Sequence, residues 1–457
     1  MILALALLFA TPASATWDAS LFERRLVALD QYRVAAEPDF QDALRPWSGR
    51  QSRIQFEAAL SVMDPGNTLQ RYATWDDRHL MVFQDADVRT VPDFTLTFAP
   101  ADAVPSSPSY TGFAARKASA TVPLAGLRIA LDPGHFGNEI DDHVGKVVRA
   151  RGQKLREGTI SGQTCWLIMK RLLELGVRRE DIFLTRPGFA PVTTVPYDDF
   201  PLEEYARRDL LRAADEPWFQ RLLQRASSPA DLLADLANDG HIAGLFLSQE
   251  RSPTRWASVR TRLFARITEL EARALLLNSF RPDLTIIIHY DTIGAGLQRS
   301  ANHVKAFVPG HWMTDELGSR EERYELVQHA LNTPGWLRSV RLSRDVVQGI
   351  SSVTGVPVHG AHGPAAASGR GSAVAAGVYT RNLALNRLVT ETEAIAYVES
   401  LFYNNATEFG RLTDESISTT VDGYTFSHSA RVDEVAQGVV QGILEYVRTT
   451  PAAEAGI

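Results

Sequence analysis

Disulfide bonds within the chain are excluded, because its 457 residues include a single cysteine. Cys165 lies in the run Trp166-Leu167-Ile168, which predicts a thiol packed in a core rather than a nucleophile. An excess of one charge is also lacking, since 54 acidic and 47 basic residues leave a formal net charge of −7. This balance gives no indication of nucleic-acid binding or of attachment to an anionic membrane.

Long apolar runs are missing as well. Membrane helices need about 18 to 20 apolar residues, and no segment reaches that length, so no stable membrane insertion is expected. The first 15 residues, MILALALLFATPASA, have a short apolar run and end in the small-x-small pattern of a cleavage site. We therefore expect a signal peptide over 1–15 and export to the periplasm or cell-wall space. No Lys or Arg precedes the apolar run, which leaves a start further upstream or a buried terminus as alternatives.

Two structural parts follow in the sequence. Residues 16–100 mix helical patterns with strand-like runs at 79–83 and 94–99, which predicts a small N-terminal α+β unit. A linker rich in Pro, Ser and Ala is expected over 101–125. From 126 to 449 strands and helices alternate, so the fold class is predicted as α/β, with a mostly parallel or mixed sheet flanked by helices.

The elements of this larger part are assigned from apolar periodicity. Strands are predicted at 127–132, 181–185, 284–289, 304–309 and 394–400, and helices at 157–175, 262–279, 340–354 and 430–448. Two insertions, 187–261 and 311–339, carry helical patterns, and 363–377 is a loop of small residues.

Polar residues that bind metals follow three of these predicted elements. His135 follows the strand LRIALD, and His289 ends the strand LTIIIH. Glu157 opens the helix between them, where a carboxylate also complements the helix dipole. Ligands of α/β folds lie at the carboxyl ends of strands, and catalytic zinc takes three protein ligands and keeps a fourth position open. The set therefore predicts a zinc site, although each residue alone also has a purely structural interpretation.

A fourth polar residue stands in a corresponding place. Glu399 lies near the end of the strand AIAYVES, where an unpaired carboxylate is costly. Glu399 is interpreted either as the group that manages a proton during catalysis or as half of a structural salt bridge.

In order along the chain, these motifs resemble the zinc-dependent N-acetylmuramoyl-L-alanine amidases of the type 3 family. The resemblance is carried by Asp132-Pro133-Gly134-His135, the glutamate that opens a helix, the strand ending in Ile-His, and VESLFYNN from Val398 to Asn405, and it covers roughly 126–449. It implies one zinc ion held by His135, Glu157 and His289, with Glu399 as the catalytic base. It also implies peptidoglycan as the substrate, cut at the amide between N-acetylmuramic acid and L-alanine.

The sequence departs from the family in two places. Phe136 replaces the usual glycine after the histidine, and the 22 residues from His135 to Glu157 exceed the usual spacing, which leaves Glu139 as a rival ligand. His143 is interpreted as a solvated loop residue, and the later loop histidines, His303, His311, His359 and His362, are not expected to bind the metal.

The polar helix predicted near 314–331 has two interpretations. In some members of the resembled family, an inserted helix covers the zinc until a protein activator moves it. Here such a plug would use carboxylates from Glu316, Glu321, Glu322 or Glu325. The alternative is a solvated helix at the domain edge, and the insertion at 187–261 is a rival lid.

Two other functions stay open at this point. The same ligands would serve another extracytoplasmic zinc peptidase or amidase. A catalytically inactive wall-binding or activator protein would keep the fold but lose a ligand or the base, whereas this chain has all four residues.

Overall fold

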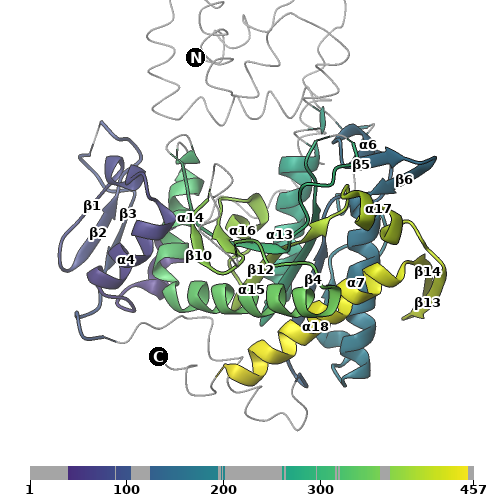
Figure 1. Cartoon of the computed structure of the whole chain (residues 1–457). Coiled ribbons are helices and arrows are strands. Elements are labelled where there is room, and N and C mark those ends of the chain that lie inside the picture. Colours follow the sequence, from purple (N-terminus) through teal and green to yellow (C-terminus); the bar gives the residue numbers. More distant parts are fainter. Residues whose placement is uncertain are drawn as a thin grey trace, which may run out of the picture. The chain divides into compact units, whose positions relative to one another are not determined.

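The structure is a computed structural model (Figure 1) that describes residues 40–87, 89–103, 124–193, 197, 199–200, 260–261, 264–294, 296–313, 316–317, 320–360 and 371–450. The expected signal peptide, most of the expected linker and most of the 187–261 insertion lie outside these residues. The chain divides into two compact units, and the larger comprises 39–194 and 265–457. The elements described below belong to this larger unit.

A seven-stranded mixed sheet forms its centre, in the order β10-β11-β9-β12-β8-β4-β7. The strands are β4 (Ile129–Pro133), β7 (Ile182–Leu184), β8 (Leu284–Asp291), β9 (Lys305–Val308), β10 (Ala373–Ala375), β11 (Val378–Thr380) and β12 (Ala394–Phe402). The four strands β12, β8, β4 and β7 run parallel, and β9 runs antiparallel to β12. The central position of β12 places its carboxyl end beside that of β8.

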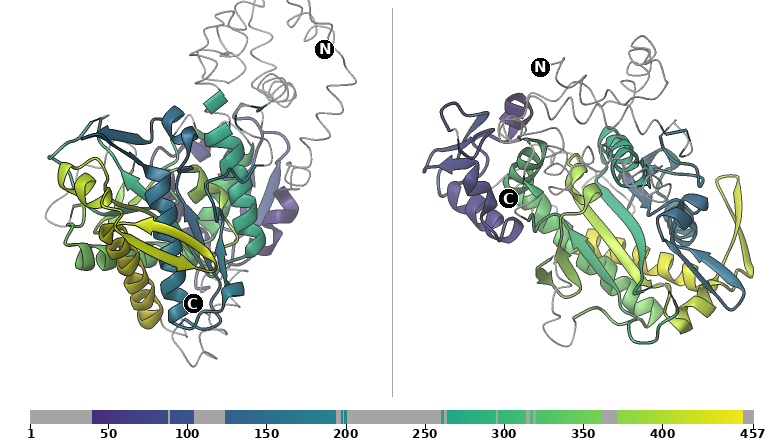
Figure 2. Two further views of the ribbon diagram at one scale, coloured as in Figure 1. Left: turned by 90° about the vertical axis from the view of Figure 1, so that its right-hand side faces the viewer. Right: turned by 90° about the horizontal axis from the view of Figure 1, so that it is seen from above.

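Helices cover both faces of this sheet (Figures 1 and 2). One face packs on α7 (Glu157–Glu174), α15 (Thr333–Thr354) and α18 (Ala430–Thr449), and the other on α13 (Glu269–Phe280) and α16 (Ala384–Leu388). Alternate residues of a strand point to opposite faces, so Ile286 and Ile288 join the first core and Ile287 joins the second. Burial on both faces explains why β8 reads as a continuous apolar run.

The predicted α/β class with a mixed sheet between helices is therefore confirmed. The predicted strands and helices of 126–449 are all present, with one marked difference in length. α15 begins at Thr333 rather than near 340, because Asn332 caps it and Pro334 fits its first turn. Three antiparallel pairs were not anticipated: β5 (Val147–Ala150) with β6 (Gln153–Arg156), β13 (Ile417–Val421) with β14 (Tyr424–His428), and β10 with β11. The expected loop 363–377 is wrong at its end, because β10 lies within it and pairs with β11.

The N-terminal part forms a three-stranded antiparallel sheet with short helices. Its elements are α3 (Phe40–Leu44), α4 (Arg53–Met63), β1 (Ala73–Trp75), β2 (His79–Val82) and β3 (Phe94–Thr97). Ser52 and Gln55 form a capping box that starts α4. The apolar side chains of this part share one core with Trp312, Leu317 and the buried face of α14 (Arg320–Leu331).

The position of α14 shows that the plug interpretation is wrong. Leu326, Val327, Ala330 and Leu331 are buried in the core shared with the N-terminal part, and α14 packs on α4. Its carboxylates are engaged locally. Glu325 pairs with Arg387 of α16 at 3.0 Å, Glu322 lies 3.7 Å from the same guanidinium, and Glu316 accepts the backbone N–H of Met313. The helix thus joins two parts of the larger unit.

None of the helices in the described ranges combines the length and apolar character needed to cross a bilayer.

Candidate metal centre

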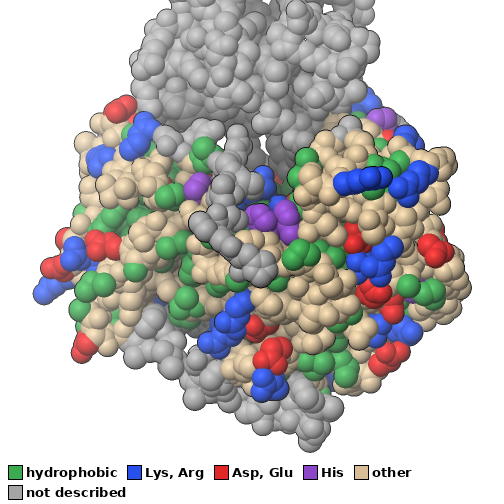
Figure 3. Space-filling view, viewed as in Figure 1, with side chains coloured by type: hydrophobic (Ala, Val, Ile, Leu, Met, Phe, Trp, Pro, Cys, Tyr) green, Lys and Arg blue, Asp and Glu red, His purple; other side chains and the backbone are tan. Residues whose placement is uncertain are grey.

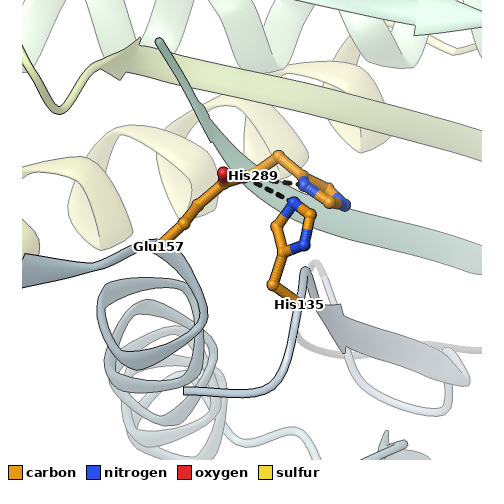
Figure 4. Close-up of side chains that lie close together, drawn as sticks. All are labelled: His135, Glu157 and His289. Carbon is orange, nitrogen blue, oxygen red and sulfur yellow. Dashed lines mark hydrogen bonds and ion pairs between the residues drawn. The ribbon is translucent and has the colours of Figure 1, made fainter. Parts of the chain in front are cut away.

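Three side chains converge at the carboxyl edge of the central sheet (Figure 4). His135 comes from the turn after β4, Glu157 from the first turn of α7 and His289 from β8. One ligand atom from each residue lies within 4.8 Å of the other two. Glu157 Oε1 is 2.9 Å from His289 Nδ1 and 3.2 Å from His135 Nε2.

The turn that carries His135 depends on a close approach between β4 and β8. Gly134 donates its N–H to the carbonyl of Ile288 at 2.7 Å, and a Cβ at position 134 would lie 2.4–2.6 Å from atoms of the His289 ring. Only glycine leaves room for the imidazole at this distance. His135 itself has a φ of 56°, in the left-handed region, which turns its side chain towards Glu157.

Asp141 holds this turn against the start of α7. Its carboxylate accepts the backbone N–H groups of Phe136 at 2.9 Å, Gly137 at 2.7 Å and Gly158 at 3.1 Å. Burial raises the pKa of Asp141 to about 6 even though these N–H groups act in the opposite direction. The Asp141 carboxylate thus fixes the backbone of Phe136 and Gly137. This explains how the turn accommodates Phe136 directly after the histidine, where the family resemblance led us to expect a second glycine.

A buried ion pair lies beneath the same turn. Arg273 of α13 donates two hydrogen bonds to the carboxylate of Asp132 and one to the carbonyl of Pro133 at 2.9 Å. Thr185 donates to Asp132 at 2.5 Å. Arg273 and Asp132 are 2% and 0% exposed, so each needs the other to offset the loss of water. The pair fixes the end of β4 just before His135.

The two histidines and Glu157 have the protonation states that bind a metal cation. Burial lowers the pKa of both imidazoles, that of His289 to about 4, so both rings are neutral near pH 7. Burial opposes ionisation of Glu157, but the charge of Lys146 and the hydrogen bonds with the His135 and His289 rings keep the pKa of this carboxyl well below its ordinary value. Lys146 Nζ lies 3.2 Å from Glu157 Oε2. Neutral imidazoles and an ionised carboxylate are the forms that bind metal ions.

Glu399 lies beside this group. In the register of β12 with its neighbours, Glu399 is opposite His289 on one side and Lys305 on the other. Its Oε2 is buried and has no hydrogen-bond partner among the described residues. Burial and the charge of Asp291 raise the pKa of Glu399 well above its ordinary value, and Lys146 and Lys305 act in the opposite direction.

The two asparagines at the end of VESLFYNN fix the loop that follows His289. Asn404 donates to the carbonyls of Ile293 at 2.7 Å and Gly296 at 2.8 Å. Asn405 caps α17 (Ala406–Leu412) through its side-chain oxygen and donates to Ala301 at 3.2 Å. The loop at the rim of the site is thereby held by side chains rather than by regular structure.

The other residues singled out from the sequence are not part of the three-residue group. Glu139 is exposed in the first turn of α6 (Glu139–His143), and His143 is exposed at the end of that helix. His303 and His359 stack on each other with ring centroids 4.0 Å apart, and His311 is 3.3 Å from the Ser372 hydroxyl. His362 lies outside the described residues. Cys165 is fully buried in the core, as predicted.

Sequence reasoning missed the residues that support the group. Asp141 and Lys146 lie on short polar segments without apolar periodicity, so nothing distinguished them from surface charges, whereas Arg273 lies on the helix predicted at 262–279 but was given no role. One signal was available for the pair of Asp132 and Arg273: an aspartate at the end of a buried strand needs a cation.

Comparisons with known proteins gave structural matches only. No protein-family model matches the chain, and no curated protein matches it by sequence. The chain is similar to the CwlD amidase from Clostridioides difficile, solved in complex with the GerS lipoprotein, with 11% identity, coverage of 71% of this chain and 100% of that one, and a TM-score of 0.38. It is also similar to the N-acetylmuramyl-L-alanine amidase Ami1 from Mycobacterium smegmatis, with 14% identity, 72% and 99% coverage, and a TM-score of 0.36.

A third match is the apo form of Ami1 from Mycobacterium abscessus, with 17% identity, coverage of 70% of this chain and 99% of that chain, and a TM-score of 0.33. All three TM-scores are below 0.5, so the geometry of the site in this chain carries the functional interpretation.

Proposed function

We propose that the protein is a zinc-dependent N-acetylmuramoyl-L-alanine amidase that hydrolyses the amide between N-acetylmuramic acid and L-alanine in peptidoglycan. The observation that carries this proposal is the convergence of His135, Glu157 and His289 within 4.8 Å, with Glu399 on the neighbouring strand. Peptidoglycan lies outside the cytoplasm, so export to the periplasm or cell-wall space belongs to the same proposal.

The residues fit a zinc ion. Two imidazole nitrogens and one carboxylate oxygen form a donor set of catalytic zinc sites, and the two rings are neutral. Glu157 Oε1 faces both rings, and Lys146 engages the other oxygen, so one oxygen is directed to the centre of the group. When bound, zinc would polarise the amide carbonyl and lower the pKa of water to about 7.

The chain itself supplies proton transfer and orientation. In its ionised form, the buried carboxylate of Glu399 would accept a proton from water and return it to the departing amine, and its Oε2 has no other hydrogen-bond partner among the described residues. The loop held by Asn404 forms a fixed rim beside the ligands. Asp141 and the Asp132–Arg273 pair keep the His135 turn in place, which preserves the geometry without contact with substrate.

Two measurements on the purified protein test this function. Metal analysis should find about one zinc per chain, and His135→Ala or His289→Ala should abolish it. Mass spectrometry of a digest of purified cell wall should show glycan whose muramic acid lactyl groups carry free carboxyls, and intact stem peptides whose first residue, L-alanine, has a free amine. Chelation should stop the reaction and zinc should restore it.

Other products would redirect the assignment. Stem peptides cut between amino acids would make the protein a zinc peptidase. Full hydrolysis by the metal-free protein would overturn the mechanism, and no hydrolysis by zinc-loaded protein would favour an inactive wall-binding role.

A further inference from the structure

The hairpin of β5 and β6 leads directly into Glu157 and carries a concentrated positive charge. Five cations and no acidic residue occur between 146 and 156, in a chain whose net charge is −7. They are Lys146, Arg149, Arg151, Lys154 and Arg156. Figure 3 shows Lys and Arg side chains gathered at the upper right, where β5 and β6 lie in Figure 1.

The hairpin has one apolar and one basic face. Val148 and Leu155 are opposite each other in the register and are buried in the main core. Arg149 is paired with Lys154 in the same register, and both side chains are directed to the other face. Like charges directly opposite on a sheet destabilise it, so this pairing has no benefit for the fold by itself.

Neutralisation of the basic face is incomplete. Asp142 is the one carboxylate paired with it among the described residues, and it contacts Lys154 at 2.6 Å, Arg156 at 3.2 Å and Arg149 at 3.4 Å. Burial opposes its ionisation, but hydrogen bonds and the charges of Arg156 and Lys154 outweigh this effect and lower the pKa of Asp142 to about 2. One negative charge thus faces three positive ones, and the Arg149 side chain is 58% exposed.

Arg151 adds a further charge at the turn. It is exposed, has a φ of 52° and forms no ion pair with any residue that the structure describes. One of its guanidinium nitrogens lies near Gly410 on α17, so the head group is beside the helix that follows VESLFYNN.

The base of the hairpin is part of the candidate metal centre. Lys146 pairs with Glu157 Oε2 at 3.2 Å, and the Glu157 N–H donates to the Lys146 carbonyl at 3.0 Å. Strands rise about 3.4 Å per residue, which places Arg149 roughly 10 Å along the hairpin from that base. An extended peptide of about five residues spans up to roughly 17 Å. A peptide held at the centre by its first amide can therefore reach the basic face.

We propose that the β5–β6 hairpin binds the carboxylates of the stem peptide, through Arg149 and Arg151, and so makes the enzyme prefer stems with free rather than amidated carboxyl groups. The inference rests on the proposed amidase function. The positive charge that the fold leaves without a partner is complementary to the acidic side chain and the carboxyl terminus of such a peptide.

Binding and hydrolysis are measured with two soluble disaccharide–peptides, one with free stem carboxylates and one in which they are amidated. The test variant is Arg149→Gln/Arg151→Gln in the full chain. The control is Arg45→Gln/Arg448→Gln, which removes the same charge from two other exposed arginines, 70% and 72% exposed. Binding is measured by calorimetry on the zinc-loaded Glu399→Gln protein.

With Arg149 and Arg151 present, the zinc-loaded Glu399→Gln protein should bind the free-carboxylate compound about tenfold more tightly than the amidated compound, as expected for two exposed ion pairs. The test variant should lose this preference and raise KM for that compound about tenfold, with kcat within about twofold. The control should change neither value. The preference should also fall at about 1 M salt, where the Debye length is about 3 Å.

Equal affinity of the wild type for both compounds would overturn the proposal, as would a preference that survives in the test variant. Absence of hydrolysis with an intact binding preference would reject the amidase function and leave the carboxylate site standing. A purely structural hairpin would show a lower melting temperature in the test variant and no change in preference.

Discussion

At the scale of single residues, the role expected of each polar side chain in the site depends on which atoms it contacts. Two glutamates illustrate this, since Glu157 is in contact with both histidines while Glu399 keeps one buried oxygen without a hydrogen-bond partner in the described part of the chain. The same residue type therefore has two expected roles, as a ligand and as a proton acceptor.

Substitution by glutamine should separate these roles. Glu399→Gln should retain about one zinc and bind substrate, while turnover falls by roughly 10² to 10⁴, the usual contribution of a general acid–base group. Glu157→Gln should lose zinc and activity together. Metal content and kcat measured on the same preparations distinguish the two patterns. Loss of zinc in Glu399→Gln would make Glu399 a ligand, and Glu139→Gln serves as the control that should retain both properties.

Gly134 should be indispensable for metal binding although it has no ligand atom. A methyl group there would meet the His289 ring at 2.4–2.6 Å, so Gly134→Ala must displace the imidazole or the turn. We expect zinc affinity to fall at least about tenfold, as for other changes in the groups around a metal site. Competition with a chelator measures this. Gly188→Ala, with nothing within 4 Å of the added methyl, should leave the affinity unchanged, and equal values for both variants would refute the steric role.

At the scale of elements, the residues at the ends of the main strands and helices were predictable from the sequence. The short hairpin and the helix packing around them were not. His135, Glu157, His289 and Glu399 stand at or near the ends of segments with apolar periodicity, which a sequence shows directly. The strands β5 and β6 have only four residues each, with one buried apolar side chain per strand, too short a pattern to distinguish from a loop. The plug interpretation failed for a related reason, because the polar face of α14 is evident in the sequence, whereas the residues that cover its apolar face lie far away along the chain, within 40–98.

The buried carboxyl of Glu325 on α14 should make stability depend on pH. Burial raises its pKa to about 7 although Arg387 is close, against an ordinary value of 4.5. Between these two values the native state binds more protons than the unfolded state, so the free energy of unfolding should fall as pH rises from about 4.5 to 7. Chemical denaturation across this range should show a smaller fall in Glu325→Gln. Glu325→Asp keeps a carboxyl group and should retain the dependence, and parallel curves for wild type and Glu325→Gln would contradict this account.

At the scale of the whole molecule, the N-terminal part shares its core with residues 312–331, which follow β9 of the main sheet in the chain. Trp312 is 1% exposed within this core, and its backbone N–H donates to Met63 of α4 at 2.8 Å. The boundaries 16–100 and 126–449 stay predictions, since the two parts were separated on sequence alone. What the structure adds is that residues 312–331, far along the chain, complete the core of 40–98.

Truncation of Trp312 should therefore weaken the chain as a whole. Trp312→Ala should lower the free energy of unfolding by about 3–5 kcal/mol, the usual cost of removing a buried aromatic side chain. Leu337→Ala, at a position 55% exposed, should change it by less than about 0.5 kcal/mol. Urea denaturation of the two variants tests this. A cost below about 1 kcal/mol for Trp312→Ala would mean that the core tolerates a large cavity.

The order of the sheet also has a consequence for how the molecule is assembled in time. β12 lies between β8 and β9, yet about 86 residues separate the end of β9 from its start. Until residues 394–402 are available, β8 and β9 each lack one of their two neighbouring strands and keep one unpaired edge, and unpaired strand edges promote aggregation. Glu399 arrives on the same late strand. A chain emerging from synthesis thus acquires its expected catalytic carboxylate in the step that completes its sheet, and on the proposed mechanism a chain without this strand would have no activity.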